Sequence, residues 1–437
     1  MDRLDRIRPF LFQNHTKKTK KVLSSFFSIL ALGTLFSAGF FLHDYVSPQA
    51  SDAFTLPAEQ AGYAIGDDMF GDLGDGYTTS ESSPVTVETS EKFSKIVAGQ
   101  YTSLGLAPDG TVWGWGDNVS GVTGSSSTGY GYYEQWPYEI PDLTNVIDIA
   151  LGGMNNHQFA LALKSDGTVW AWGDNGDGQL GDGTGTDSAQ YIPSEVLAPS
   201  GSDGYLTNIV AIAASTGSTE TAAAVRSDGT VWIWGQNEYY EFGNNSTSPT
   251  YSAYPIENTT LTNVKSIALG DENGFALKSD GSVWSWGQNS AGETGNTSTG
   301  GSDCVQNYSP YNEGAYCVTT PQEISGLSNI TDVSANYGSN AITQALFIQS
   351  GGDVYTLGRY QSTPTEISGL SNIIKAQTGY DSTTYPYPAQ IVALKTNGTV
   401  YTVSIGSTLG TPATLSGISD VTDIAAGTTH LLMLSSE

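Results

Sequence analysis

Short stretches of alternating apolar and polar residues recur along the chain and are separated by turn-forming residues. The phrase PDGTVWGWGDN begins at Pro108, and close copies of it begin at Ser165, Ser227 and Ser279. In each copy an Asp-Gly pair supplies the positive φ angles of a tight hairpin, and the alternating β-branched and aromatic residues after it predict a strand. Two tryptophans one residue apart lie on one face of that strand. The pattern predicts repeated β-hairpins whose tryptophans pack between neighbouring sheets.

Each repeat contains further strand-like segments around this hairpin, and worn copies at Gly351 and Thr396 extend the series. Two apolar segments precede the Asp-Gly pair, as in residues 145–150 and 159–164. A loop of variable length follows the tryptophans. We then expect an outer strand that opens on a proline, where no ladder donor is lost. These prolines are Pro84, Pro137, Pro193, Pro255, Pro321, Pro364 and Pro412. Seven units of four strands predict an all-β, seven-bladed β-propeller.

The two ends of the repeat region each supply half a unit. The C-terminal residues 429–437 read THLLMLSSE, which is only the first half of a repeat. Residues 61–76 read AGYAIGDDMFGDLGDG and match VWAWGDNGDGQLGDG at 169–183, while Pro84–Val87 can form the outer strand. We therefore expect the last blade to combine two strands from each terminus, which closes the ring and hides its edges. The propeller is predicted to span 61–437.

Basic and apolar residues distinguish the first 60 residues from the repeats. Residues 1–21 carry seven Lys and Arg side chains against two acidic ones, and residues 22–42 carry no charge. At about 1.5 Å per residue, such a helix can cross a hydrocarbon core of ~30 Å. We therefore expect a basic cytoplasmic tail at 1–21, a transmembrane anchor or signal helix at 22–42 and a linker at 43–60. The propeller would lie outside the cell membrane, either tethered or, after cleavage, secreted.

The repeats are strongly acidic, which changes the partners to be expected. The chain of 437 residues has 16 Lys and Arg against 44 Asp and Glu. Without the first 21 residues, 9 basic residues stand against 42 acidic ones, a formal charge of −33. Binding to phosphates relies on Lys and Arg, so this charge excludes nucleic acid as a partner class.

The two cysteines, Cys304 and Cys317, lie 13 positions apart in a polar, tyrosine-rich stretch. No neighbouring histidine or further cysteine completes a zinc site. In an exported domain we expect a local disulfide, which would stabilise the fold by roughly 3 kcal/mol in a chain-entropy model and would act mainly on its own loop. Two free thiols are the alternative.

The repeats resemble those of the regulator of chromosome condensation family, whose seven-bladed propellers carry DGxVYxWGxNxxGQLG and GxxHSLAL phrases. Residues 174–181 read DNGDGQLG and match the first phrase, while His157 and His430 lie in copies of the second. The resemblance covers 61–437. It implies the propeller fold, but activity in such a fold follows the loops.

The resemblance also implies candidate activities. The family includes a nucleotide exchange factor for the Ran GTPase that docks on nucleosomes, and secreted bacterial members that include a β-lactamase inhibitory protein. An exported, acidic propeller suits neither a cytosolic GTPase nor nucleosomal DNA. We therefore interpret the chain as an exported, bacterial-type member and keep an exchange-factor-like regulator as the alternative function.

A search for catalytic and metal-binding residues returns little. His157 and His430 occupy the repeat phrase, where packing between blades is the expected role, and no nucleophile–base–acid set can be argued. Acidic loops at 67–75 and 174–187 lack the spacing of an EF-hand, and Asp-Gly pairs are common in turns. We predict no catalytic residue, no metal ion and no cofactor. A surface hydrolase, which needs a carboxylate pair assembled by the ring, is a second alternative.

Candidate binding residues lie in the variable loops that follow the tryptophan pairs. Loops of this kind leave an up-and-down propeller at one face, and their Tyr, Ser, Gly and Asn content resembles that of antibody paratopes. The aromatic residues in question are Tyr130, Tyr132, Tyr133, Trp136, Tyr239, Tyr240, Phe242, Tyr308, Tyr311 and Tyr316. The alternative is that these rings pack beneath their own loops. We predict a monomeric, non-catalytic module that binds a protein or a glycan through this face.

Overall fold

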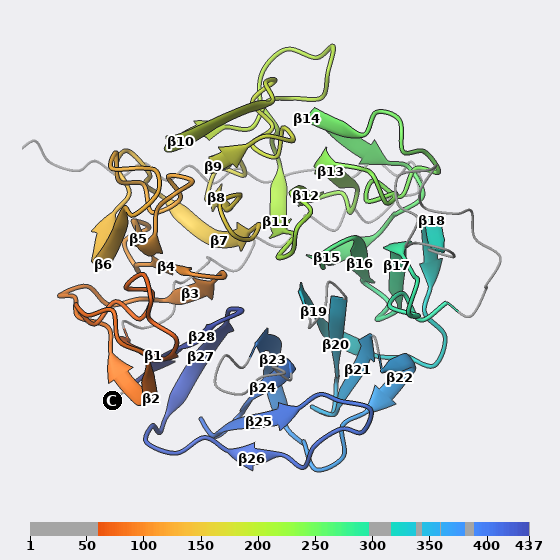
Figure 1. Ribbon diagram of the computed structural model, residues 1–437. Coiled ribbons are helices and arrows are strands. Elements are labelled where there is room, and N and C mark those ends of the chain that lie inside the picture. Colours follow the sequence, from red (N-terminus) through yellow and green to blue (C-terminus); the bar gives the residue numbers. More distant parts are fainter. Residues whose placement is uncertain (1–59, 297–315, 338–342, 359, 381–388, 437) are drawn as a thin grey trace, which may run out of the picture. The chain divides into compact units, whose positions relative to one another are not determined.

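Seven four-stranded antiparallel sheets surround a common centre in the computed structural model (Figure 1). The structure describes residues 60–296, 316–337, 343–358, 360–380 and 389–436, and these residues contain no helix. Within each sheet the strands run as a meander from the centre to the rim. The predicted all-β, seven-bladed propeller is confirmed.

Six blades consist of consecutive strands, ordered from the innermost to the outermost. Blade 1 contains β3 (Lys95–Ala98), β4 (Thr102–Leu106), β5 (Val112–Asp117) and β6 (Tyr133–Glu139). Blade 2 contains β7 (Val146–Gly152), β8 (Phe159–Lys164), β9 (Val169–Asn175) and β10 (Thr186–Glu195). Blade 3 contains β11 (Ile209–Ala214), β12 (Thr221–Arg226), β13 (Val231–Gln236) and β14 (Tyr251–Asn258). Blade 4 contains β15 (Val264–Leu269), β16 (Asn273–Lys278), β17 (Val283–Gln288) and β18 (Cys317–Glu323). Blade 5 contains β19 (Ile330–Tyr337), β20 (Thr343–Gln349), β21 (Val354–Gly358) and β22 (Gln361–Glu366). Blade 6 contains β23 (Ile373–Tyr380), β24 (Ala389–Lys395), β25 (Val400–Ser404) and β26 (Ala413–Thr414).

The seventh, closing blade joins strands from the two ends of the repeat region. Its order from rim to centre is β2 (Glu81–Thr86), β1 (Ala61–Gly66), β28 (His430–Ser435) and β27 (Val421–Ala426). Strand β1 pairs with β28 over its whole length, with Tyr63 opposite Met433. The predicted closure by two strands from each terminus is confirmed.

The Asp-Gly hairpins between the second and third strands form as predicted. In blade 2 the carboxylate of Asp166 accepts hydrogen bonds from the Thr168 main-chain N–H (3.0 Å) and hydroxyl (2.7 Å), and Gly167 has a φ of 81°. Blades 1, 3 and 4 repeat this arrangement between Asp109 and Thr111, Asp228 and Thr230, and Asp280 and Ser282. Glycine adopts a positive φ without a steric penalty, so these turns can be tight in every one of the four blades.

The outer strands begin earlier than their prolines predict. Pro137 lies in the middle of β6, and Pro193 lies near the end of β10. The pairing of these outer strands shifts register close to the proline, as between Gly114 and Gly116 on β5. Since a bulge leaves a residue outside the ladder, a proline there costs no hydrogen bond.

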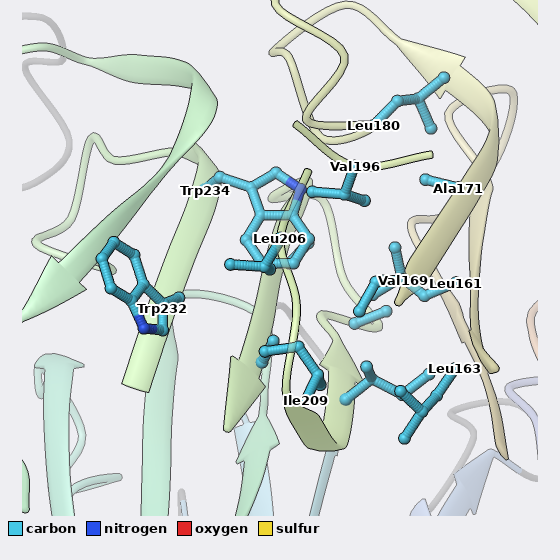
Figure 2. Close-up of a cluster of buried hydrophobic side chains, with 14 of the residues drawn as sticks. Leu161, Leu163, Val169, Ala171, Leu180, Val196, Leu206, Ile209, Trp232 and Trp234 are labelled. Atoms are coloured by element: carbon cyan, nitrogen blue, oxygen red, sulfur yellow. The ribbon is translucent and has the colours of Figure 1, made fainter. Parts of the chain in front are cut away.

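The core consists of apolar clusters between successive blades. Figure 2 shows the cluster between blades 2 and 3, where Leu161 and Val169 of blade 2 lie beside Ile209 and Trp234 of blade 3. The Trp234 side chain is fully buried, and its indole lies close to Val196 in this view. Each sheet therefore buries both faces against its neighbours, which explains why the repeats cannot fold singly.

The predicted cytoplasmic tail (1–21), membrane or signal helix (22–42) and nearly all of the linker (43–60) lie outside the described residues. Among the residues that are described, no helix has the length and apolar character needed to cross a membrane.

Candidate functional site

An exposed group of aromatic side chains lies where the closing blade meets blade 1. The described residues contain fourteen exposed large hydrophobic side chains, and half of them belong to this one region of the ring. They are Met69, Tyr77, Tyr130, Tyr132, Tyr133, Trp136 and Tyr138, hereafter the aromatic surface. Tyr130 is 83% exposed and Trp136 is 55% exposed, so both rings can contact a partner directly. Clustered exposed apolar side chains on a soluble domain usually mark an interaction site.

Strand β6 carries three of these side chains because its ladder is interrupted. Glu134 pairs with Gly116 and Tyr138 pairs with Gly114, so four steps along β6 match two steps along β5. Trp136 and Pro137 fall within this bulge. A bulge of this kind turns side chains away from the regular pleat. Trp136 therefore projects from the rim of the ring.

The loop between β1 and β2 covers part of β6 and completes the surface. The main-chain N–H of Gly76 donates to the Gln135 carbonyl oxygen at 3.1 Å. A Cβ atom on Gly76 would lie 2.7 Å from Trp136 Nε1, so the loop approaches the indole as closely as glycine permits. Tyr77 follows directly, which brings a ring of the closing blade next to those of blade 1.

The segments that carry the aromatic surface contain acidic residues and no Lys or Arg. The chain contains no Lys or Arg between Gln60 and Glu91, nor between Ile96 and Leu163. Exposed or half-exposed carboxylates accompany the rings at Glu134, Glu139 and Asp142. Carboxylates beside aromatic faces favour a cationic group, because both attract positive charge.

The structure separates the predicted binding residues into three groups. Tyr130, Tyr132, Tyr133 and Trp136 are exposed and lie together. Tyr239 and Tyr240 are half-buried in the β13–β14 loop, and Tyr316 is 37% exposed. Tyr308 and Tyr311 lie outside the described residues.

Phe242 is a correction to the predicted binding set, since it is 1% exposed. It packs in the apolar cluster between blades 3 and 4, together with Trp286 and Leu261. Its ring therefore stabilises the blade, and the alternative that rings pack beneath their own loops holds at this position. The signal was present in the sequence, because Phe242 occupies the leucine position of the GQLG phrase.

Sequence reasoning missed three members of the aromatic surface: Met69, Tyr77 and Tyr138. Tyr138 is two residues after Trp136 on β6, but the bulge at Trp136 interrupts the strand period of two. Met69 and Tyr77 belong to a distant segment that reaches blade 1 only through ring closure.

The predicted disulfide is described at one of its two ends. Cys317 opens β18, is buried and takes part in a disulfide. Cys304 lies outside the described residues, so the Cys304–Cys317 pairing stays a prediction.

A serine, a histidine and an aspartate meet at the closing blade in a way that the sequence did not indicate. Ser103 Oγ lies 2.7 Å from His430 Nε2, and His430 Nδ1 lies 3.3 Å from Asp72 Oδ2. The Ser103 hydroxyl also donates to the Asp72 carbonyl oxygen at 2.9 Å. All three side chains are fully buried. A substrate cannot reach Ser103 in this arrangement, so the network connects segments of the closing blade and blade 1.

The two repeat-phrase histidines have different environments. His430 pairs with Gly66, as Phe159 pairs with the equivalent Gly173, so His430 packs between blades as expected. His157 precedes Phe159 by two residues, and its side chain is 59% exposed. The expectation that His157 packs between blades is wrong. Its neighbour Asn156 donates to the Tyr130 hydroxyl at 2.8 Å, which places the His157 loop beside the aromatic surface.

Three buried glutamates lie in loops at one end of the blades, the end at which the first strand connects to the second and the third strand connects to the fourth. Burial raises the pKa of Glu241 to about 8 and that of Glu272 to about 9. Burial likewise raises the pKa of Glu220 to about 9, and Asp177 acts in the same direction through a hydrogen bond and its charge. At neutral pH these groups hold protons unless a cation replaces them.

The ring encloses a central cavity of about 250 Å³. Two lysines of the inner strands line it and pair with aspartates of neighbouring blades, Lys95 with Asp148 and Lys375 with Asp423. The rest of the lining is mostly Ala, Ile, Leu and Val. Paired charges of this kind link neighbouring inner strands.

Seven closed blades, an internal repeat and a loop-rich face define the class of repeat β-propellers. Two models of the regulator of chromosome condensation (RCC1) repeat match the chain; the first covers residues 166–221, 228–277 and 280–341, and the second covers 93–122, 146–179 and 264–293. The chain belongs to the RCC1 repeat family.

Similar proteins share part of the sequence or the fold. The E3 ubiquitin-protein ligase HERC2 of Homo sapiens is 28% identical over 245 residues, which is 54% of this chain and 5% of the ligase. The ultraviolet-B receptor UVR8 of Arabidopsis thaliana is 32% identical over 136 residues, which is 31% of this chain and 29% of the receptor. The chain thus spans less than a third of these relatives.

A solved structure of Prp20p from Saccharomyces cerevisiae, described with its binding to Gsp1p and histones, superimposes with a TM-score of 0.65 at 18% identity. The match covers 87% of this chain and 92% of Prp20p. At this identity the match shows the shared fold alone.

Proposed function

We propose that the propeller is a non-catalytic binding module whose aromatic surface contacts a protein partner. The observation that carries the proposal is the concentration of half of the exposed large hydrophobic side chains at one junction of blades. Interfaces concentrate their binding energy in Tyr and Trp side chains, which this surface supplies. The surrounding carboxylates favour a segment rich in Lys or Arg.

Family membership supports a protein rather than a glycan as the partner. Prp20p, which has the same fold, is described with its binding to two kinds of protein, Gsp1p and histones. The serine–histidine–aspartate set in the described residues is sealed from solvent, so it gives no support to a serine hydrolase.

We further propose that the module lies outside the cytoplasm, tethered by or released from residues 22–42. The basic residues before this uncharged segment support that orientation. Protease added to intact cells, or assay of the culture medium, should find the propeller accessible. Full protection of the propeller within intact cells would contradict this location.

The binding proposal is tested by comparing variants of the full chain against one captured partner. Trp136→Ala and Tyr132→Ala should each weaken binding about tenfold, corresponding to about 1.4 kcal/mol, if the ring is central to the interface. Tyr251→Ala is the matched control, because Tyr251 is 47% exposed on the outer strand of blade 3. The dissociation constant of each variant should be measured with the purified partner.

A partner that binds both aromatic-surface variants like the parent, and loses affinity for Tyr251→Ala, would contradict the proposed surface. A purified oligosaccharide that competes with the partner at this surface would reassign it to glycan binding. An exchange-factor-like regulator is the second candidate, supported by family membership. It predicts faster nucleotide release from a Ran-type GTPase on addition of the full chain, and no acceleration would exclude it.

A further inference from the structure

A cluster of metal-ligating side chains lies at the boundary of blades 2 and 3. His157 comes from the β7–β8 loop, Asp174 from the end of β9, and Glu220 from the residue before β12. One ligand atom of each lies within 4.8 Å of the others. The three side chains thus converge from three separate segments and two blades.

The spacing within this cluster suits ligands of one ion better than a hydrogen bond. His157 Nδ1 and Asp174 Oδ2 are 3.5 Å apart, beyond the usual N–H···O range of about 2.7–3.2 Å. Two ligands at about 2.0–2.1 Å from a tetrahedral zinc ion are roughly 3.4 Å apart. The imidazole and the carboxylate therefore already stand at a metal-ligand separation.

The Asp174 carboxylate is held in place by its own loop. Its Oδ2 atom accepts hydrogen bonds from Gln179 Nε2 at 2.7 Å and from the Gly176 main-chain N–H at 3.1 Å. Hydrogen bonds of this kind orient the ligands of metal sites. His157 is 59% exposed, so an ion can reach the cluster from solvent.

A buried carboxylate of blade 4 provides a separate indication of a cation site. Asp271 is 1% exposed, and its Oδ1 atom accepts the main-chain N–H groups of Ser218 and Thr219, directly before Glu220. Its Oδ2 atom is buried and has no hydrogen-bond partner among the described residues. Asp271 therefore lies against the segment that carries Glu220. An unpaired buried carboxylate oxygen is costly unless a cation or donor faces it.

We propose that His157, Asp174 and Glu220 bind one divalent transition-metal ion of the zinc type, with Asp271 completing the negative environment. Imidazole together with carboxylate oxygens is a ligand set that such ions accept. The ion would join the loops of blades 2 and 3 beside the Tyr130 loop.

Isothermal titration of the full chain with Zn²⁺, after treatment with a chelator, tests the site. The parent should bind one ion per chain. Glu220→Gln should bind at least about tenfold more weakly, because its neutral amide replaces a carboxylate ligand. His157→Ala should also bind at least about tenfold more weakly. Glu366→Gln, an exposed glutamate on β22, should behave like the parent.

The chain has two further histidines, His15 and His43, so a His15→Ala/His43→Ala variant is included. This variant should retain the parent affinity. No saturable zinc binding by the parent overturns the proposal. So does zinc binding that persists in His157→Ala and Glu220→Gln but disappears in the His15→Ala/His43→Ala variant. Thermal melting of each variant without zinc confirms that it is folded.

Discussion

At the scale of single residues, the second tryptophan of each repeat links its blade to the preceding one. Trp115, Trp172, Trp234 and Trp286 are fully buried. Each Nε1 atom donates a hydrogen bond to a main-chain carbonyl in the loop of the preceding blade, at Asp72 (3.0 Å), Val122 (2.7 Å), Gln179 (2.8 Å) and Glu241 (2.6 Å). The repeated phrase thus supplies both an apolar and a polar contact at the interface between neighbouring blades.

Trp234→Phe should destabilise the propeller by about 2–4 kcal/mol. The change removes part of a fully buried ring and leaves the Gln179 carbonyl without its donor. Trp284→Phe is the matched control, since Trp284 is only half-buried and stacks with Lys278. Urea unfolding followed by tryptophan fluorescence measures both. An equal loss of unfolding free energy in the two variants would show that the hydrogen bond from Trp234 to the Gln179 carbonyl adds no measurable stability.

The sequence predicted the tryptophan packing but not the difference between the two members of a pair. Trp170 and Trp172 lie on one face of β9, as their spacing requires, yet only Trp172 is fully buried. Trp170 instead has Lys164 over its ring and donates to the Thr168 hydroxyl. Which ring is covered depends on the loop of the neighbouring blade, and a local pattern carries no information on that contact.

At the scale of elements, the closing blade is held by more than strand pairing. His430 on β28, Asp72 in the β1–β2 loop and Ser103 on β4 form a buried polar chain across three segments. Burial lowers the pKa of His430 to about 4, so the imidazole is neutral at physiological pH. Burial also raises the pKa of Asp72 well above its ordinary value, and Asp72 Oδ2 lies 3.3 Å from His430 Nδ1. The Ser103 hydroxyl donates to the Asp72 carbonyl, so it can accept a hydrogen bond from Nε2 of the neutral His430 ring.

His430→Ala should therefore destabilise the domain by about 2–4 kcal/mol, because it removes the contacts of the imidazole with Ser103 and Asp72 and opens a cavity. His157→Ala is a control with the same change at an exposed site and should alter the free energy of unfolding by less than about 0.5 kcal/mol. Chemical denaturation near neutral pH in the presence of a chelator measures both. Equal free energies of unfolding for the two variants would show that the contacts of His430 with Ser103 and Asp72 do not stabilise the closing blade.

The elements could be predicted where their signals are local. The Asp-Gly pairs determined the hairpins, and the split repeat at 61–76 and 429–437 indicated closure by both termini. The aromatic surface could be predicted only in part, because the segment with Gly76 and Tyr77 meets β6 through ring closure rather than along the chain. The metal-ligand cluster could not be predicted, since Glu220 lies 63 positions after His157 in a different repeat.

At the scale of the whole molecule, acidity has two distinct consequences. Exposed carboxylates give the repeats their formal charge and favour a basic partner, an attraction that added salt should weaken. Buried carboxyl groups instead couple stability to pH. Burial is the main reason that the pKa is raised to about 7 for Asp68, about 6 for Asp117, about 8 for Glu241 and about 9 for Glu272. In the unfolded chain these groups titrate near about pH 4.

At pH values between the pKa of these groups in the unfolded chain and their pKa in the folded protein, the folded protein binds more protons than the unfolded chain. The free energy of unfolding therefore falls as pH rises through this range. The stabilisation associated with these groups is complete below about pH 4 and is lost as pH passes through about 6 to 9. His430 has the opposite sign, since its lowered pKa makes stability fall as pH drops from about 6.5 to 4. Above about pH 6.5 only the carboxyl groups act.

We therefore expect the melting temperature in chelator-treated buffer to fall by several degrees between about pH 6.5 and about pH 9, at constant ionic strength. A Glu220→Gln/Glu272→Gln variant should lose much of this dependence, because the amides imitate the protonated carboxyl groups and do not titrate. Glu366→Gln, which changes an exposed side chain, should retain the parent slope. Zn²⁺ should raise the melting temperature of the parent most at the alkaline end, where Glu220 no longer has to release a proton. A parent whose stability is flat or rises over this range would show that the buried carboxyl groups are ionised in the folded protein.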